Sequence, residues 1–395
     1  MNKKETLEIR KQFTPENCTI SRICGCYVDG EKNIKLEVKE AFGSIQEEEA
    51  FKYFDIFRHT LSGSIGKNLL NMEFPMAQEM PDGTQSFLMK LKSSRLEDDM
   101  LVEEFYQKVI EHYAYGTNYY IILIHAAYDI PGKSSDNLEM FDSSDNVYEY
   151  LLCSICPVNL SKAGLCYNTE KNSIEDRIRD WIVAAPISGF LFPAFNDRNT
   201  DIHSILYYSK NPEELQQDFV DHVLGCTLPL SASGQKETFQ NMIADALGDD
   251  CHYEVVKNLH ENLHEMAEVN KDNPEPVTLS KNDVRCVLED SGVPDEKIQF
   301  FEKEFEEVVK PDTPILVSNI AETRKFSIET PDVIIKVNPE RMDLVETRVI
   351  DGRACLVIPV DDYLEVNGMP VSVEAPAGGI TSASSAEEAA ASLSE

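Results

Sequence analysis

The stretch LHENLHEM (259–266) holds two histidines four residues apart, His260 and His264, with Glu261 directly after the first. On a helix this spacing puts both imidazoles on one face, where they can bind a zinc ion. The glutamate can then accept a proton from a zinc-bound water, which is the chemistry of a metal-dependent hydrolase.

Other features of the stretch favour a plain amphipathic helix. The zinc proteases that share this pattern have an uncharged residue after the second histidine, where this chain has Glu265. A third ligand is also needed, and the segment KNDVRCV (281–287), at the spacing where one branch of those enzymes has a glutamate, offers only Asp283. We expect the two histidines to border an apolar stripe, with zinc hydrolysis as the alternative.

A second group of polar residues lies in FNDRNTDIHS (195–204), between two apolar segments that read as strands. It contains Asp197, Arg198, Asp201 and His203. Functional sites often form from loops at strand ends, so this group is a candidate enzyme site. The same composition is also ordinary for a turn.

Two further patterns are incomplete. LSGSIGKNLL (61–70) is similar to a phosphate-binding loop but has Leu61 and Asn68 where that loop has Gly and Ser or Thr, so a helix end and a turn are the simpler interpretation. Cys24, Cys26, Cys153 and Cys156 could give four thiolates, but CSIC (153–156) continues a strand pattern in which residues three apart point to opposite faces. We expect buried thiols and predict no cofactor or metal. His125, within YIILIHAAY, is expected to be a core histidine.

The formal net charge of the 395-residue chain is −34, which repels nucleic acid at long range. Residues 1–45 differ from the rest, because their eight Lys or Arg and seven Asp or Glu give a net charge of +1. Any nucleic-acid contact would use this segment, and the candidate residues are Lys3, Lys4, Arg10, Lys11 and Arg22. No apolar run is long enough for a membrane span, and no signal peptide is evident, so we expect a cytoplasmic protein with reduced cysteines.

The pattern of apolar residues predicts an α+β fold with a central antiparallel sheet and helices. The runs 118–130 and 147–158 are almost wholly apolar and should be adjacent central strands covered on both faces, joined by a polar surface loop. A hairpin is expected over 19–42, and helices over 2–12, 46–60, 84–94 and 98–114. A helix over 211–225 with an Asn cap should open an acidic helical region.

We divide the chain into four parts. Residues 1–210 form the α+β domain, 211–312 the acidic helical region, 313–374 a strand-rich region with a hairpin at Asp351-Gly352, and 375–395 a disordered tail.

Several stretches together identify a resemblance that spans about 1–370. They are IRKQFTPENCTISRICGCYVDGEKN, LSGSIGKNLLNMEFP, LIHAAYDIPGK, LLCSICPVNLSKAGL, GFLFPAFNDRNTDIHSILYYSKNPEEL, TPDVIIKVNPER and VIDGRACLVIPVDD. The chain resembles a bacterial family catalogued as domain of unknown function 4317, which implies no activity. The order of its parts also looks like that of the 37-kilodalton nucleoid-associated protein family, which implies association with the nucleoid and no catalytic residues.

The sequence therefore favours a non-catalytic binding protein, with a protein partner or nucleoid DNA as its ligand. The competing class is an enzyme, either a zinc hydrolase at His260, Glu261 and His264 or a site around Asp197 and His203. The sequence does not specify an oligomeric state.

Overall fold

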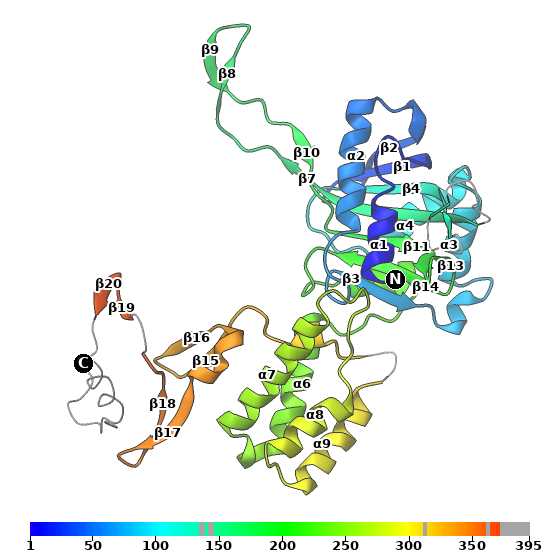
Figure 1. Ribbon diagram of the computed structural model, residues 1–395. Helices are drawn as coiled ribbons and strands as arrows, with labels where there is room; N and C mark the ends of the chain where they lie inside the picture. The colour runs from blue at the N-terminus through cyan, green and yellow to red at the C-terminus, as the bar shows by residue number, and fades with distance from the viewer. Residues whose placement is uncertain (134–138, 141–145, 311–313, 361–363, 372–395) are drawn as a thin grey trace, which may run out of the picture. The chain divides into compact units, whose positions relative to one another are not determined.

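The two long apolar runs form neighbouring central strands in the computed structural model of the chain, as the sequence predicts (Figure 1). Strands β4 (Tyr119–Asp129) and β7 (Val147–Leu160) pair antiparallel over eleven residues of each, from Tyr119 opposite Pro157 to Asp129 opposite Val147. The structure describes residues 1–133, 139–140, 146–310, 314–360 and 364–371. Most of the predicted surface loop between the two strands, and all of the predicted disordered tail, lie outside these residues.

In the described residues the largest sheet has eight strands, in the order β2-β1-β4-β7-β11-β14-β3, with β10 paired to the end of β7. Every pairing in it is antiparallel. Its strands are β1 (Ile20–Val28), β2 (Ile34–Ala41), β3 (Leu69–Glu73), β4, β7, β10 (Trp181–Val183), β11 (Ser188–Phe192) and β14 (Ser204–Ser209). The prediction of an α+β fold around a central antiparallel sheet is confirmed.

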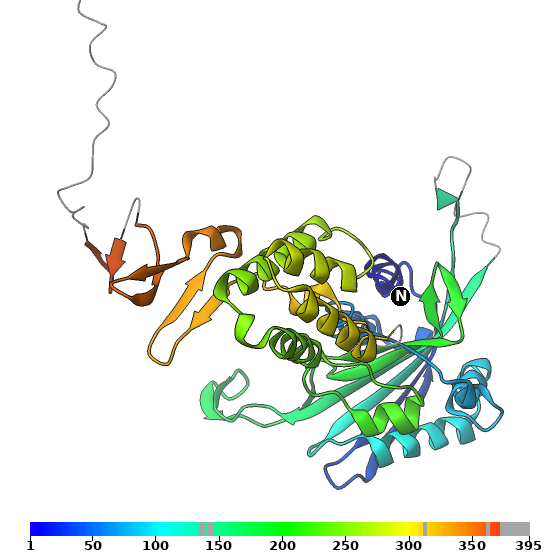
Figure 2. The same cartoon turned by 90° about the horizontal axis from the view of Figure 1, so that it is seen from below.

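Helices cover both faces of this sheet, which explains why its central strands are apolar on both sides. The helices of the first part are α1 (Lys3–Arg10), α2 (Glu47–Thr60), α3 (Thr84–Ser93) and α4 (Asp99–His112). Side chains of α3 and α4, such as Leu88 and Phe105, share one buried cluster with Cys153. Side chains of α1 and α2, such as Ile9 and Phe57, share the other with Cys156. Figure 2 shows α1, dark blue beside the N label, and the cyan helix α4 on opposite sides of the sheet.

The predicted helix over 211–225 is wrong at its start. The helix begins at α5 (Gln217–Phe219), continues as a π-helical turn η3 (Val220–Leu224), and ends at Gly225 with a left-handed φ of 70°. Asn211 does not cap a helix here. Its side chain accepts a hydrogen bond from the Glu213 amide and its carbonyl accepts one from the Ser209 hydroxyl, so the Asn-Pro pair forms a separate turn.

A third buried cluster belongs to a helical bundle that follows η3 in the chain. Its helices are α6 (Ala232–Leu247), α7 (Tyr253–Val269), α8 (Lys281–Asp290), α9 (Asp295–Val308) and α10 (Val317–Ile320). Their acidic residues face water while residues such as Leu259, Leu288 and Phe301 fill the interior. The remaining short helical turns are η1 (Phe42–Ser44), η2 (Met76–Glu79), η4 (Gly248–Asp250) and η5 (Pro339–Leu344).

The sheet also extends into a narrow arm that the sequence did not predict. Beyond the paired ends of β7 and β10, the hairpin β8 (Leu165–Asn168) and β9 (Ser173–Asp176) forms the tip (Figure 1). We call residues 161–183 the arm. Several of its apolar side chains are exposed, including Tyr167, Ile178 and Trp181.

The chain divides into two compact units, Met1–Thr323 and Arg324–Glu395. Among its described residues the second unit contains three hairpins, β15 (Phe326–Glu329) with β16 (Ile334–Val337), β17 (Glu346–Ile350) with β18 (Arg353–Val357), and β19 (Leu364–Val366) with β20 (Met369–Val371). The middle one turns at Asp351-Gly352, as predicted, and both turn residues have positive φ. Two short pairs in the first unit, β5 (Gly132–Lys133) with β6 (Glu139–Met140) and β12 (Ala194–Asn196) with β13 (Asn199–Asp201), complete the strands.

Candidate functional site

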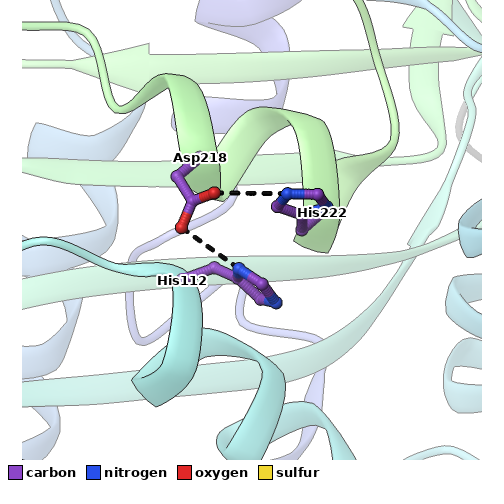
Figure 3. A group of neighbouring side chains, drawn as sticks. All are labelled: His112, Asp218 and His222. Carbon is purple, nitrogen blue, oxygen red and sulfur yellow. Dashed lines mark hydrogen bonds and ion pairs between the residues drawn. The ribbon is translucent and has the colours of Figure 1, made fainter.

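Three side chains that can bind a metal ion converge where the end of α4 meets α5 and η3 (Figure 3). His112 is the last residue of α4, Asp218 is in α5, and His222 is in η3. The two oxygens of Asp218 face one ring each, at 3.1 Å from Nδ1 of His112 and 3.3 Å from Nε2 of His222. The centroids of the two rings are 4.4 Å apart.

The packing of the two helical segments brings these residues together. Val109 of α4 and Val220 and Val223 of the α5–η3 segment are buried in the same cluster on one face of the sheet, so the polar residues beside them meet at the surface. The side chain of Gln216 fixes the contact, because it bonds to both the amide and the carbonyl of Ala114, at 3.2 and 3.3 Å. His222 lies on a π-helical turn, and such turns are frequent at functional sites.

One ligand atom from each of the three residues lies within 4.8 Å of the other two. Imidazole nitrogens with one carboxylate form a donor set suited to divalent transition metals such as zinc, nickel, copper and iron. Three protein ligands leave a coordination position for water. His112 has 25% of its side chain exposed, whereas Asp218 and His222 have 59% and 56%, so an ion here would lie on an open surface. That exposure gives water free access to an ion held here.

The histidines that the sequence singled out are arranged differently. His260 and His264 are half-buried on α7, and burial lowers the pKa of His260. Glu261 lies 3.9 Å from the Lys257 ammonium. Among the described residues, none of these three belongs to a group of three or more potential metal ligands.

The polar group at 197–203 is not gathered around one cavity. Arg198 reaches α1, with its guanidinium 2.8 Å from the Glu8 carboxylate. His203 instead binds Glu79 in η2, at 2.7 Å. Although burial opposes it, hydrogen bonds from Ser204, Asn196 and the His203 amide hold the pKa of Asp201 below its usual range.

Asp197 is part of the same local turn and has a left-handed backbone φ of 51°. Its neighbour Asn196 accepts a hydrogen bond from the Met1 amino group, which also donates to Asn71. These contacts, with that of Arg198, anchor α1 to the sheet, which is a structural role for the segment.

The five candidate nucleic-acid residues do not form one surface. Lys3 and Lys4 are exposed on α1, Arg10 is half-exposed there, and Lys11 is exposed directly after the helix. Arg22 is on β1 and lies near Glu97, at 3.9 Å. Residues two apart on a strand point to the same face, so Arg22 shares the face of Cys24 and Cys26, whose cluster is on the other side of the sheet from α1.

The four cysteines considered as zinc ligands, Cys24, Cys26, Cys153 and Cys156, are buried. Cys153 and Cys156 belong to clusters on opposite faces, as the strand pattern predicts. Burial raises the pKa of Cys24 to about 11 and that of Cys26 to about 12, so both are neutral at physiological pH. His125, with 1% of its surface exposed, is a buried core residue as predicted, and its Nδ1 lies 2.7 Å from the Ser21 hydroxyl.

Sequence patterns carry no strong signal for the group at His112, because 106 positions separate it from Asp218. The only local sign was the spacing of Asp218 and His222, four residues apart as one helical face requires. The unexpected π-helical turn and the packing of two distant segments complete the group.

A comparison with protein families gives one match, described as Domain of unknown function (DUF4317), which covers residues 1–369. No curated protein matches the chain. The resemblance to the family of unknown function is therefore confirmed, while the architectural resemblance to the 37-kilodalton nucleoid-associated family stays a prediction. Among the described helices, none combines the length and apolar character needed to cross a membrane.

Proposed function

Because the chain belongs to the DUF4317 family, whose description assigns no function, we propose a function from geometry: a non-catalytic protein that binds one divalent transition-metal ion at His112, Asp218 and His222. The observation that carries this proposal is the convergence of two imidazoles and a carboxylate within 4.8 Å.

The ion would join two segments that are distant in the sequence. His112 ends α4, whereas Asp218 and His222 belong to the segment before the helical bundle. Ligands from both segments mean that the ion binds the folded protein much better than the unfolded chain. Binding therefore stabilises the fold, by about 2.7 kcal/mol when the free ion is at a hundred times its dissociation constant.

Calorimetric titration of the metal-free protein with zinc tests the proposal. We expect one zinc per chain for the unchanged protein. His222→Ala should weaken binding by roughly a hundredfold or more, because loss of an outer partner of a metal ligand alone costs about 10–100-fold. Binding should also weaken in acid, since protons compete with the metal for the imidazoles.

The matched control is His252→Ala, which removes an exposed histidine at the start of α7 and should leave zinc binding unchanged. The double variant His260→Ala/His264→Ala removes the alternative zinc ligands on α7. It should bind zinc as tightly as the unchanged protein. If the double variant loses zinc while His222→Ala retains it, the site is on α7 and the proposal is wrong.

A second candidate function is association with DNA through α1. It is favoured by the exposed ammonium groups of Lys3 and Lys4 on this helix and of Lys11 directly after it. Neutralising phosphates releases counterions, so binding should weaken steeply as salt rises. A mobility-shift series over salt concentration, with alanine at Lys3, Lys4, Arg10 and Lys11, tests it, and a shift that the four substitutions leave unchanged would reject this function.

A further inference from the structure

A cavity of about 480 Å³ lies between the start of α1, the turn that follows α2, the end of α7 and the region of α10. All four segments belong to the first compact unit. The volume is in the usual range for sites that bind small molecules, roughly 300–1,000 Å³. The turn is the one formed by LSGSIGKNLL, the sequence that is similar to a phosphate-binding loop.

The cavity is positively charged in a strongly acidic protein. Its charged lining residues are Lys3, Lys67 and Lys271 with Glu268 and Glu275, a net charge of +1, whereas the whole chain carries −34. An excess of one sign of charge in a concave site raises the local concentration of the opposite ion. The lining therefore favours an anion.

The turn that carries Lys67 is held rigidly in place. The amides of Lys67, Asn68 and Leu69 all donate to the Ser64 carbonyl, at 3.1, 3.0 and 3.1 Å. The Asn319 side chain donates to the Gly66 carbonyl at 3.1 Å. Gly66 has a φ of +79°, and a Cβ there would lie 2.0 Å from a methyl group of Leu316, so only glycine fits.

These bonds also show how the site differs from a phosphate-binding loop. The amides of residues 67–69 are used within the turn and are not available to hold a phosphate. The anion must therefore be recognised mainly by ammonium groups. Lysine ammonium groups bind phosphate as point charges.

Part of the lining is apolar and suits an organic group attached to the anion. Ile65 comes from the turn, Met266 and Ala267 from α7, Val277 from the segment between α7 and α8, and Val317 from α10. An organic group attached to the anion can make apolar contacts with these side chains, whereas an inorganic ion cannot.

We propose that this cavity binds a small organic phosphate, with its phosphate group between Lys67, Lys271 and Lys3 and its organic part against the apolar lining. A phosphate monoester carries close to two negative charges near neutral pH, and its three terminal oxygens are strong acceptors for hydrogen bonds from the lysine ammonium groups. This site is separate from the metal site and does not depend on the proposed metal binding.

Calorimetric titration with inorganic phosphate, adenosine 5′-monophosphate, ribose 5-phosphate, glycerol 3-phosphate and adenosine tests the proposal. At least one organic phosphate should bind more tightly than inorganic phosphate, and adenosine should not bind. Lys67→Ala and Lys271→Ala should each weaken binding about tenfold, the size expected for loss of one charge-assisted hydrogen bond. His222→Ala should have no effect.

Two more variants distinguish a ligand site from a structural effect. Glu268→Gln removes a carboxylate that lies 3.2 Å from the Lys271 ammonium, so it should tighten binding severalfold. Lys162→Ala, an exposed lysine on the arm, should change nothing. If Lys67→Ala fails to fold, Lys271→Ala and Glu268→Gln still test the proposal, because both side chains are exposed and their replacement should leave the fold intact.

Three results would overturn the assignment. They are no binding of any phosphate, organic phosphates that bind no better than inorganic phosphate, or affinities that Lys271→Ala and Glu268→Gln leave unchanged.

Discussion

The histidines of this chain show how neighbours decide the role of a single side chain. His125 is buried in β4 and bonded to Ser21, whereas His203 is exposed and bonded to Glu79. His112 and His222 share the carboxylate of Asp218, and only there do three potential metal ligands meet among the described residues. Residue type and local spacing therefore indicate what a histidine can do, and tertiary contacts decide what it does.

His125 should make the fold sensitive to acid. Burial disfavours its charged form, so in the folded protein its pKa lies below the ordinary value of 6.5. The unfolded chain then takes up the proton first, so stability is unaffected above about pH 6.5 and falls as the pH is lowered below that value. We predict that the free energy of unfolding decreases less in His125→Gln than in the unchanged protein between pH 7.5 and pH 5.5. Parallel decreases in both chains would contradict this role.

At the level of elements, the sequence predicted the centre of the fold well. The runs that became β4 and β7 have uninterrupted apolar patterns and sufficient length, which is why their identity and adjacency could be inferred. Strand β3 was missed because LLNME is short and carries no turn signal of its own. The arm was missed because its apolar residues are separated by charged ones and gain no core to pack on.

Gly189 of β11 should be essential for packing the sheet against α2. A Cβ at this position would lie 2.3 Å from the Cys153 carbonyl oxygen and 2.7 Å from a methyl group of Thr60. Overpacking of this kind typically costs about 1–3 kcal/mol, so Gly189→Ala should lower the free energy of unfolding in urea by that amount. A Cβ at Gly43 would meet nothing within 4 Å, so Gly43→Ala is the matched control and should change stability by less than about 0.5 kcal/mol. Equal effects of the two substitutions would show that Gly189 has room for a Cβ and would contradict this close packing of β11.

The arm can be observed through the only tryptophan of the chain, Trp181, which is 57% exposed. An indole in water emits at long wavelength and is readily quenched by acrylamide. We predict both properties for the protein in solution, with Trp181→Phe as the control for tyrosine emission. Short-wavelength emission with weak quenching would mean that a partner or another part of the chain covers the arm.

At the level of the whole molecule, the metal group and the cavity both depend on contacts that no local pattern reveals. The metal group joins α4 to a segment 106 residues later, and the cavity joins segments from both ends of the first unit. The sequence predicted the helices and the turn that hold these residues, but not the tertiary contacts that bring the residues together. The net charge of −34 attracts cations to the protein and repels anions at long range, so an anion can bind only where basic residues gather.

The most direct test of the account is the visible absorption spectrum of the protein loaded with cobalt(II), which reports the ligands of the ion. We predict one cobalt per chain, bound by nitrogen and oxygen ligands, with bands that His222→Ala and Asp218→Asn abolish and His260→Ala/His264→Ala leaves unchanged. If the bands persist in both of the first two variants, or if no cobalt binds at all, His112, Asp218 and His222 are not a metal site.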